Sequence, residues 1–198
     1  MTGNTFSNNN GSGLWFDVGD SQISVTNNVS TNNTNDGGNG GGDGIRVEVS
    51  CNATLSGNTT SGNALGGIDV VNSHDLTVNA NKVSNNAKIA IRIQATNRIG
   101  SSSNCGAQNF ATNDNVNSNT ITMGTNSIVG VVGYGSCGSC VNGDSFSGNA
   151  YSTGGNCGAN LWKWWDGSAE HTVAFSTGNP SWQGTYGQDA MSSGGACS

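Results

Sequence analysis

A short apolar motif recurs along the chain at a nearly fixed interval. It reads GLWFDV at 13–18, GIRVEV at 44–49, GIDVVN at 67–72 and AIRIQA at 90–95. The leading residues Leu14, Ile45, Ile68 and Ile91 lie 31, 23 and 23 residues apart. Such a period is too short for a propeller blade and lacks the leucine–asparagine pattern of a horseshoe-shaped solenoid. It predicts an all-β parallel β-helix in which each repeat forms one rung and like residues stack about 4.8 Å apart.

A second motif keeps step with the first and contains asparagine at its fourth position. It reads VTNNVSTNN at 25–33, LSGNTTSGN at 55–63 and VNANKVSNN at 78–86, and Asn4 opens the series. Weaker copies at 116–123 and 145–151 add Asn119 and Asn149. A tight turn in every rung leaves backbone polar groups out of reach of water, and an asparagine amide supplies both a donor and an acceptor. We therefore expect a stacked structural ladder of Asn28, Asn58, Asn81 and Asn119.

Composition favours a folded protein and restricts its partners. Only 9% of the 198 residues are charged, 32 are glycine and the formal net charge is −6. Disordered chains usually combine high net charge with few β-branched residues, whereas this chain has periodic Ile and Val. The absence of a basic patch argues against nucleic acid as a partner. No apolar run is long enough for membrane insertion.

The cysteines indicate an oxidising, extracellular setting. Their even number in a chain rich in Gly, Asn and Ser favours structural disulfides. The CGSC sequence at 137–140 has the spacing of redox and zinc motifs, but it lacks a second ligand pair and a following helix. We predict no metal site there, and we assign all six cysteines to disulfides: Cys51, Cys105, Cys137, Cys140, Cys157 and Cys197.

The repeats and their breaks give the domain organisation. We expect β-helix rungs over 1–158, with loop insertions at 34–44 and 97–115, and a capping segment of the same domain over 159–198. The Gly-rich insertion 34–44 is similar to a calcium-binding nonapeptide but has the wrong Gly/Asp spacing. The last segment concentrates tryptophans, which bury the open end of the coil, form a sugar-stacking platform, or do both. The N-terminal rung has no capping helix, so we expect missing upstream rungs or end-to-end self-association through its edge.

The outward positions of the GLWFDV strands form a strip that is unusually rich in charge for this chain. Asp17 and Glu48 would share one column about 5 Å apart, which should raise the pKa of one carboxyl. Opposite charges on adjacent strands are also ordinary structural pairs. We expect Val129 and Val131 to occupy the outward positions of the next rung, where the charged strip ends. The strip predicts a site with catalytic Glu48, Asp17 and Asp69, and substrate-binding Trp15, Arg46, Arg92, Gln94 and His74.

The quoted repeats resemble right-handed parallel β-helix repeat proteins of the pectate-lyase-like superfamily. NNNGSGLWFDV, GIRVEVSCNATLSGNTTSGN and GIDVVNSHDLTV carry the resemblance, which is strongest to large secreted bacterial members. The closing WQGTYGQDAMS at 182–192 is similar to the end of several carbohydrate-active members. The resemblance implies a right-handed coil of about six to seven rungs, secretion, and a possible Ca²⁺ cofactor, although no catalytic motif of the superfamily is present.

Three functions follow as hypotheses. The first is a secreted lyase or glycoside hydrolase that acts on an extracellular polysaccharide, with an acidic polymer as one candidate, through Glu48 and Asp17. The second is a non-catalytic carbohydrate-binding or adhesion module that uses the same strip. The third is a structural β-helix that stacks into filaments. A flat threonine array would indicate ice binding, but the outward positions are mixed and charged, so we do not expect it.

Overall fold

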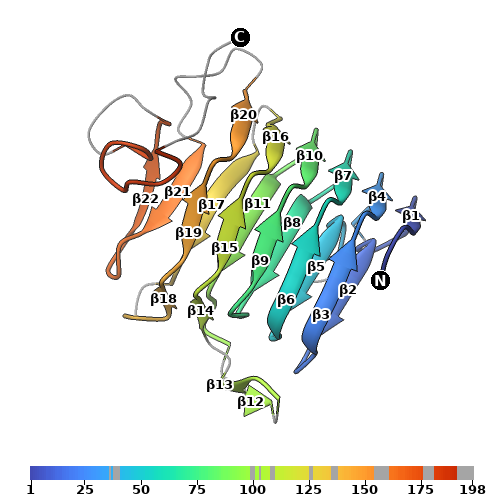
Figure 1. Cartoon of the computed structure of the whole chain (residues 1–198), viewed down its shortest axis with the longest axis horizontal. Coiled ribbons are helices and arrows are strands. Elements are labelled where there is room, and N and C mark those ends of the chain that lie inside the picture. The colour runs from blue at the N-terminus through green and yellow to red at the C-terminus, as the bar shows by residue number, and fades with distance from the viewer. Residues whose placement is uncertain are drawn as a thin grey trace.

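The protein is all-β, and most of its strands run parallel in three large sheets (Figure 1). The structure is a computed structural model that describes residues 1–35, 37, 41–98, 101–102, 104–107, 110–124, 127–134, 138–153, 161–175 and 181–190. These residues contain strands, bridges and turns and no helix. Among them, no element is a helix long and apolar enough to cross a membrane.

Sheet I holds the apolar motifs found in the sequence. Its strands, in spatial order, are β2 (Leu14–Asp17), β5 (Ile45–Glu48), β8 (Gly66–Val71), β11 (Ile89–Gln94), β17 (Ile128–Val132), β21 (Trp162–Trp165) and β22 (Glu170–Val173). Neighbours pair in parallel except β21 and β22, which are antiparallel.

Sheets II and III hold the strands on either side of the asparagine motif. Sheet II consists of β3 (Ser21–Thr26), β6 (Cys51–Ser56), β9 (Thr77–Asn79), β15 (Asn115–Asn117) and β19 (Ser145–Ser147). Sheet III consists of β1 (Thr5–Ser7), β4 (Val29–Thr31), β7 (Thr59–Ser61), β10 (Lys82–Ser84), β16 (Thr120–Thr122) and β20 (Ala150–Ser152). Two short pairs complete the fold: β12 (Ser101–Ser102) with β13 (Gly106–Ala107), and β14 (Ala111–Thr112) with β18 (Val141–Asn142).

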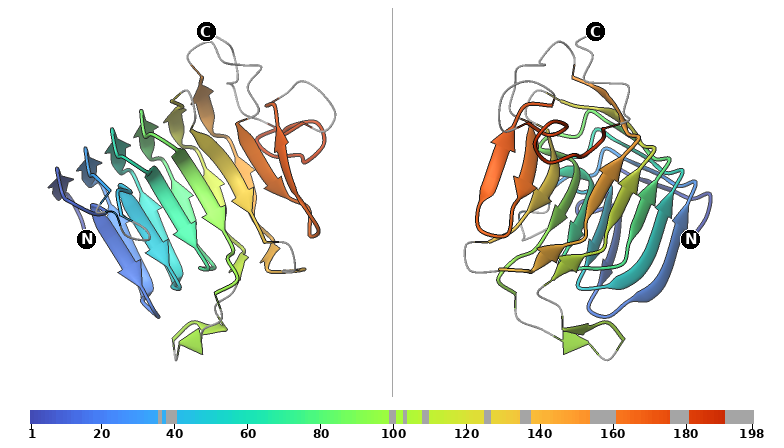
Figure 2. Two further views of the ribbon diagram at one scale, coloured as in Figure 1. Left: turned by 180° about the vertical axis from the view of Figure 1, so that it is seen from behind. Right: turned by 60° about the vertical axis from the view of Figure 1, so that its left-hand side comes forward.

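The chain visits the three sheets in a repeating order. Strands β1 to β11 belong to sheets III, I and II in strict rotation, so each of β1 to β8 pairs with the strand three places later. Figure 2 shows the resulting stack of similar passes from the side and nearly end-on. The arrangement is compatible with a β-helix-like solenoid, as the repeat predicts.

The register of sheet I confirms the alignment made from sequence. Leu14 pairs with Ile45, Ile45 with Ile68, and Ile68 with Ile91. Their side chains, with the next inward residues of each strand, form the core between the sheets. One assignment was wrong: Val129 and Val131 pair with the inward residues Ile91 and Ile93 and are fully buried. The register of β17 differs by one residue from the expected one, and in a strand such a shift turns every side chain to the other face.

The predicted asparagine ladder is present at the corner between sheets II and III. Asn58 shows the pattern: its Nδ2 donates to Val25 O and to Asn81 Oδ1, both over 2.9–3.0 Å, and its Oδ1 accepts from the backbone and side chain of Asn28. The buried asparagines thus satisfy the hydrogen-bonding groups of one another and of the backbone in neighbouring passes. Links between consecutive members connect Asn4, Asn28, Asn58, Asn81, Asn119 and Asn149.

A second ladder lies five residues further along the chain and was missed by the sequence analysis. It joins Asn9, Asn33, Asn63 and Asn86 through side-chain bonds of 2.8–2.9 Å. The last asparagine in STNN, TSGN and VSNN provides its signal. Both corners that flank sheet III are therefore built on stacked amides.

The insertion 97–115, which follows β11, runs back across the outside of the molecule, and we call it the excursion. It carries the β12–β13 hairpin, which projects from the stack in Figure 1. A disulfide joins Cys105 of this segment to Cys51 of β6, and Asn104 donates to Gly19 O over 3.0 Å. Cys140 is also disulfide-bonded. The predicted Cys137, Cys157 and Cys197 lie outside the described residues, and the disulfide that is shown fits the oxidising setting expected from the sequence.

Candidate functional site

The outward side chains of sheet I form the two columns predicted from the sequence. One column contains Trp15, Arg46, Asp69 and Arg92, and the other contains Asp17, Glu48, Val71 and Gln94. Unexpectedly, this outer face is largely buried over β5 and β8. Arg46 and Glu48 are each 8% exposed, and Asp69 is fully buried.

Asp69 is held between two arginines. Arg92 Nε and Nη2 each donate to a different Asp69 carboxylate oxygen over 2.8 Å, and Arg46 Nη1 donates to Asp69 Oδ2 over 3.0 Å. The two-pronged contact from Arg92 is the strongest geometry that arginine and carboxylate form. A carboxylate so enclosed is not open to a substrate, and this arrangement favours a structural role for Asp69.

Glu48 and Asp17 are also engaged by arginines. Glu48 accepts from Arg46 Nε over 2.9 Å and from Arg98 Nη1 over 2.5 Å, and Arg98 also lies 3.8 Å from Asp17. Arg98 belongs to the excursion, which the sequence analysis treated only as an insertion. Burial raises the pKa of Asp17, and the nearby Glu48 carboxyl adds to the increase, in the direction expected from their shared column.

The remaining predicted binding residues are spread around this network. Trp15 is exposed, with the Arg46 guanidinium 5.6 Å from its ring centre in a cation–π contact. His74 has both ring nitrogens occupied, by Asp75 Oδ2 at 2.7 Å and by Cys105 O at 2.9 Å. His74 therefore links the excursion, through Cys105, to the body of the molecule. Gln94 is half-buried on β11 beside Val71.

Asp43 completes the charged network from the end of the Gly-rich insertion. Its Oδ2 lies 3.4 Å from Arg46 Nη1, and its Oδ1 has no hydrogen-bond partner among the described residues. Burial, together with the nearby Asp69, raises its pKa to about 7. The described part of the chain contains no cluster of three or more His, Cys, Asp or Glu that could hold a metal ion, so the Ca²⁺ expectation gains no ligand set here.

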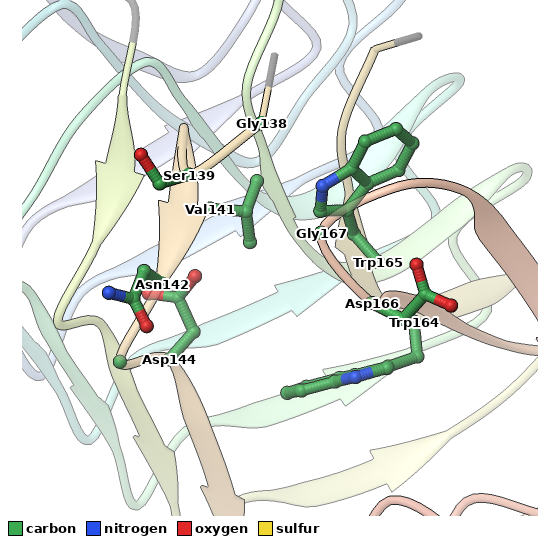
Figure 3. A pocket seen from close by; sticks show the side chains of 10 residues that line it. Gly138, Ser139, Val141, Asn142, Asp144, Trp164, Trp165, Asp166 and Gly167 are labelled. Carbon is green, nitrogen blue, oxygen red and sulfur yellow. The ribbon is translucent and has the colours of Figure 1, made fainter. Parts of the chain in front are cut away.

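A separate cleft of about 490 Å³ lies at the C-terminal end of the stack. Figure 3 shows Trp164 and Trp165 of β21 on one side, and Asn142 and Asp144, from β18 and the turn that follows it, on the other. The lining is Gly138, Ser139, Val141, Asn142, Gly143, Asp144, Trp164, Trp165, Asp166 and Gly167.

The two indoles are fixed by their surroundings. Trp164 makes an edge contact with Trp182 and a tilted contact with Tyr186, both at 5.8 Å between ring centres. Trp165 lies against the backbone of Gly133, where a Cβ atom would come within 2.4 Å of the indole ring. Trp165 is 5% exposed, and its Nε1 has no hydrogen-bond partner in the described part of the chain. The walls of the cleft are thus preformed.

The two carboxyl groups of the cleft differ in protonation. Burial raises the pKa of Asp144 to about 7, while the Asp114 N–H that it accepts over 2.8 Å acts in the opposite direction. Its Oδ2 is buried and has no partner among the residues described. Asp166 is exposed, and donors from the Ala169 and Ser168 backbone and from His171 hold its pKa well below the usual range. The cleft therefore combines a carboxyl that keeps its proton into the neutral range with a carboxylate.

The sequence analysis found the tryptophans of this cleft but not its carboxyl groups. The cluster LWKWW at 161–165 was predicted to be a cap, a sugar platform or both; in β21, Trp162 is buried and Trp164 is half-buried. Asp144 gave no signal because it occupies an inward turn position in the motif NGDSF, where an asparagine or an apolar residue would be equally ordinary.

The fold and the cleft define a class of protein: an all-β chain of parallel sheets with an aromatic-lined cleft at one end. The chain matches no family model, no curated protein and no solved structure.

Proposed function

We propose that this protein binds a saccharide in the C-terminal cleft. The observation that carries the proposal is the pair of adjacent tryptophans, Trp164 and Trp165, held rigidly beside small polar side chains. Indole rings pack on the apolar faces of sugar rings, and a few placed polar groups select the hydroxyls. Ser139 and Asn142 supply such groups on the opposite wall.

The ligand we propose is a neutral saccharide. The described lining contains two carboxyl groups and no lysine or arginine, so an acidic sugar would meet repulsion there. The arginines that were expected to bind an acidic polymer, Arg46 and Arg92, are instead committed to Asp69. We therefore propose a neutral saccharide in place of the acidic polysaccharide that the sequence suggested.

A titration with neutral and acidic oligosaccharides, followed by tryptophan fluorescence, tests the proposal. We expect saturable binding of a neutral oligosaccharide that Trp164→Ala abolishes. Trp15→Ala is the matched control, because Trp15 is an exposed indole on β2, the first strand of sheet I, and does not line the cleft. Binding that is lost in Trp15→Ala and kept in Trp164→Ala would move the site to the charged strip and overturn this assignment.

Glycoside hydrolysis in the same cleft is a second candidate. It is favoured by two carboxyl groups whose environments push their pKa values in opposite directions, the usual arrangement of an acid and a base. Asp144 would donate its proton to the glycosidic oxygen as the bond to the anomeric carbon breaks. Asp166 would take a proton from the water whose oxygen joins that carbon.

Product analysis separates binding from catalysis. A hydrolase releases new reducing ends from a neutral polysaccharide, and Asp144→Asn removes this activity while saccharide binding remains. Absorbance of an unsaturated product from an acidic polysaccharide would indicate a lyase instead. Turnover that is lost in Glu48→Gln but kept in Asp144→Asn would restore the site predicted from sequence, whereas binding without turnover would leave a carbohydrate-binding or adhesion module.

The finer architecture and setting expected from the repeats are also part of this proposal. They comprise a right-handed coil of about six to seven rungs related to the pectate-lyase-like superfamily, and secretion into an oxidising environment. The register of the stacked strands and the Cys51–Cys105 disulfide support them. Light scattering over a range of concentrations tests end-to-end self-association, which requires filaments that grow with concentration.

A further inference from the structure

The outer face of sheet II is uniform in chemistry. On each strand of sheet II the two outward residues nearest the Asn28–Asn149 ladder flank an apolar residue that is almost fully buried, such as Leu55 or Val78. All ten of these positions are serine, threonine or asparagine, and none of them is buried; β3 and β6 are longer and have one further exposed residue each, Gln22 and Asn52. We name this surface the hydroxyl face: Ser24, Thr26, Thr54, Ser56, Thr77, Asn79, Asn115, Asn117, Ser145 and Ser147.

The hydroxyl face is a regular lattice. The pairings place its residues in two columns, one running from Ser24 through Thr54 and Thr77 to Asn115 and Ser145. Adjacent strands lie about 4.8 Å apart, and alternate side chains along a strand lie about 6.6 Å apart. The ladder of buried asparagines beside it and the apolar core beneath it fix this spacing. The polar groups are therefore held at fixed, repeating positions.

The face has the properties that recognition of a repeating, uncharged surface requires. No charged side chain stands among its ten positions, although the chain contains 18 charged residues (6 basic and 12 acidic). The side chains are short and have little rotamer freedom to lose on contact. Most have hydroxyl groups that can both donate and accept hydrogen bonds, as a water molecule does. There is also no aromatic ring to stack on a sugar.

We propose that the hydroxyl face binds ice. An ice surface is an uncharged lattice of donors and acceptors with a fixed repeat, and a rigid array of hydroxyls and amides complements it over many weak contacts at once. The lack of aromatic side chains disfavours the other solid lattice of hydroxyls, crystalline polysaccharide. This function is independent of the cleft, which lies at the C-terminal end of the stack.

Adsorption of the full chain to growing ice crystals tests the proposal. We expect the purified protein to enter ice and to slow its recrystallisation, and Thr54→Tyr to abolish both effects because a large ring lifts the face from the lattice. A second variant, Thr77→Tyr, makes the same test on the next strand. Thr120→Tyr is the matched control: it is an exposed strand threonine on sheet III. Thermal unfolding verifies that each variant is folded.

Each outcome decides the proposal. Loss of ice adsorption in both sheet II variants with retention in Thr120→Tyr supports it. No adsorption by the unmodified protein, or equal adsorption by all variants, overturns it. A parallel assay with microcrystalline cellulose shows whether the face binds solid polysaccharide instead: adsorption there that Thr54→Tyr abolishes, without any effect on ice, replaces the ice assignment. Trp164→Ala should leave adsorption to ice unchanged, which separates this test from that of the cleft.

Discussion

Asp189 ends the asparagine ladder by accepting from Asn149. Asp189 Oδ1 accepts from the backbone N–H of Asn149 over 3.0 Å and from its side-chain amide over 2.9 Å. Asp189 Oδ2 accepts from Tyr151 Oη over 2.6 Å and from Trp182 Nε1 over 3.0 Å. A carboxylate only accepts hydrogen bonds, so it satisfies these donors at the last step of the ladder.

Replacement of Asp189 by alanine should therefore be strongly destabilising. It leaves buried donors on Asn149, Tyr151 and Trp182 without their acceptor, and we expect a loss of about 3–5 kcal/mol in the free energy of unfolding. Asp189→Asn should lose less, because it keeps one acceptor. Urea unfolding measures both, with Asp20→Ala as the exposed control. An equally small loss of unfolding free energy in Asp189→Ala and Asp20→Ala would show that Asp189 is not required to stabilise the end of the ladder.

The stability of the fold should decrease as the pH rises from about 4 to 7. Burial raises the pKa of Asp144 from the ordinary 3.8 to about 7, so the folded protein binds a proton that the unfolded chain releases. The stabilisation is complete below the unfolded pKa and is lost as the pH rises through the folded one. Asp43, with its pKa also raised to about 7, acts in the same direction.

Asp144→Asn tests this pH dependence. The amide keeps the acceptor for the Asp114 N–H and never ionises, so the variant should lose part of the slope and be more stable than the wild type at pH 8. We expect a difference on the order of 2–4 kcal/mol between pH 5 and pH 8 that is reduced in the variant. Melting curves at both pH values decide the matter, and parallel pH profiles for the two proteins would contradict the raised pKa.

Asp69→Ala should be among the most damaging substitutions in sheet I. It leaves the buried guanidinium of Arg46 and the half-buried one of Arg92 without their shared carboxylate, at a cost of about 3–5 kcal/mol. Glu170→Ala is the control, because it breaks an ion pair with Lys163 that is more exposed to solvent and should cost less than about 1 kcal/mol. Denaturant midpoints that shift equally in both variants would disprove a structural role for the network.

The Cys51–Cys105 disulfide should stabilise the fold by closing a long loop. The two cysteines are 54 residues apart, and a crosslink of that span contributes about 2–4 kcal/mol. Under oxidising conditions, we expect the Cys51→Ala/Cys105→Ala protein to unfold at a lower denaturant concentration than the unmodified protein. Reduction alone is not a clean test, because Cys140 is also disulfide-bonded. His74→Ala, which removes the contact with Cys105 O but leaves the disulfide, should cost less.

The repeats made much of the fold predictable. Apolar residues at a fixed period define the strands of sheet I, and the periodic Asn28, Asn58 and Asn81 define a corner, because both depend on local pattern alone. The predicted register was wrong at Val129, because the repeat before this strand is interrupted. The sequence there does not show which side chains of the strand point into the core. The second ladder was overlooked although its period is the same, since runs of adjacent asparagines do not show which member points inward.

The candidate site was less predictable than the fold. Placing Arg46, Asp69 and Arg92 in one column followed from the repeat, yet their accessibility did not. Arg98 and Cys105 come from an excursion with no repeat, and only the folded chain shows that this segment crosses the outer face and engages Glu48 and Cys51.

By itself, the sequence determined that the chain is all-β, that its passes are parallel, and which side chains stack in columns, because a repeat imposes the same local geometry on each copy. Only the tertiary structure decided which columns meet solvent. Burial of Asp69, the proton held by Asp144 and the cleft between Asp144 and Trp164 arise where segments far apart in sequence come together. The electrostatic environment of a side chain depends on all neighbours in space, and a periodic pattern specifies only the neighbours above and below.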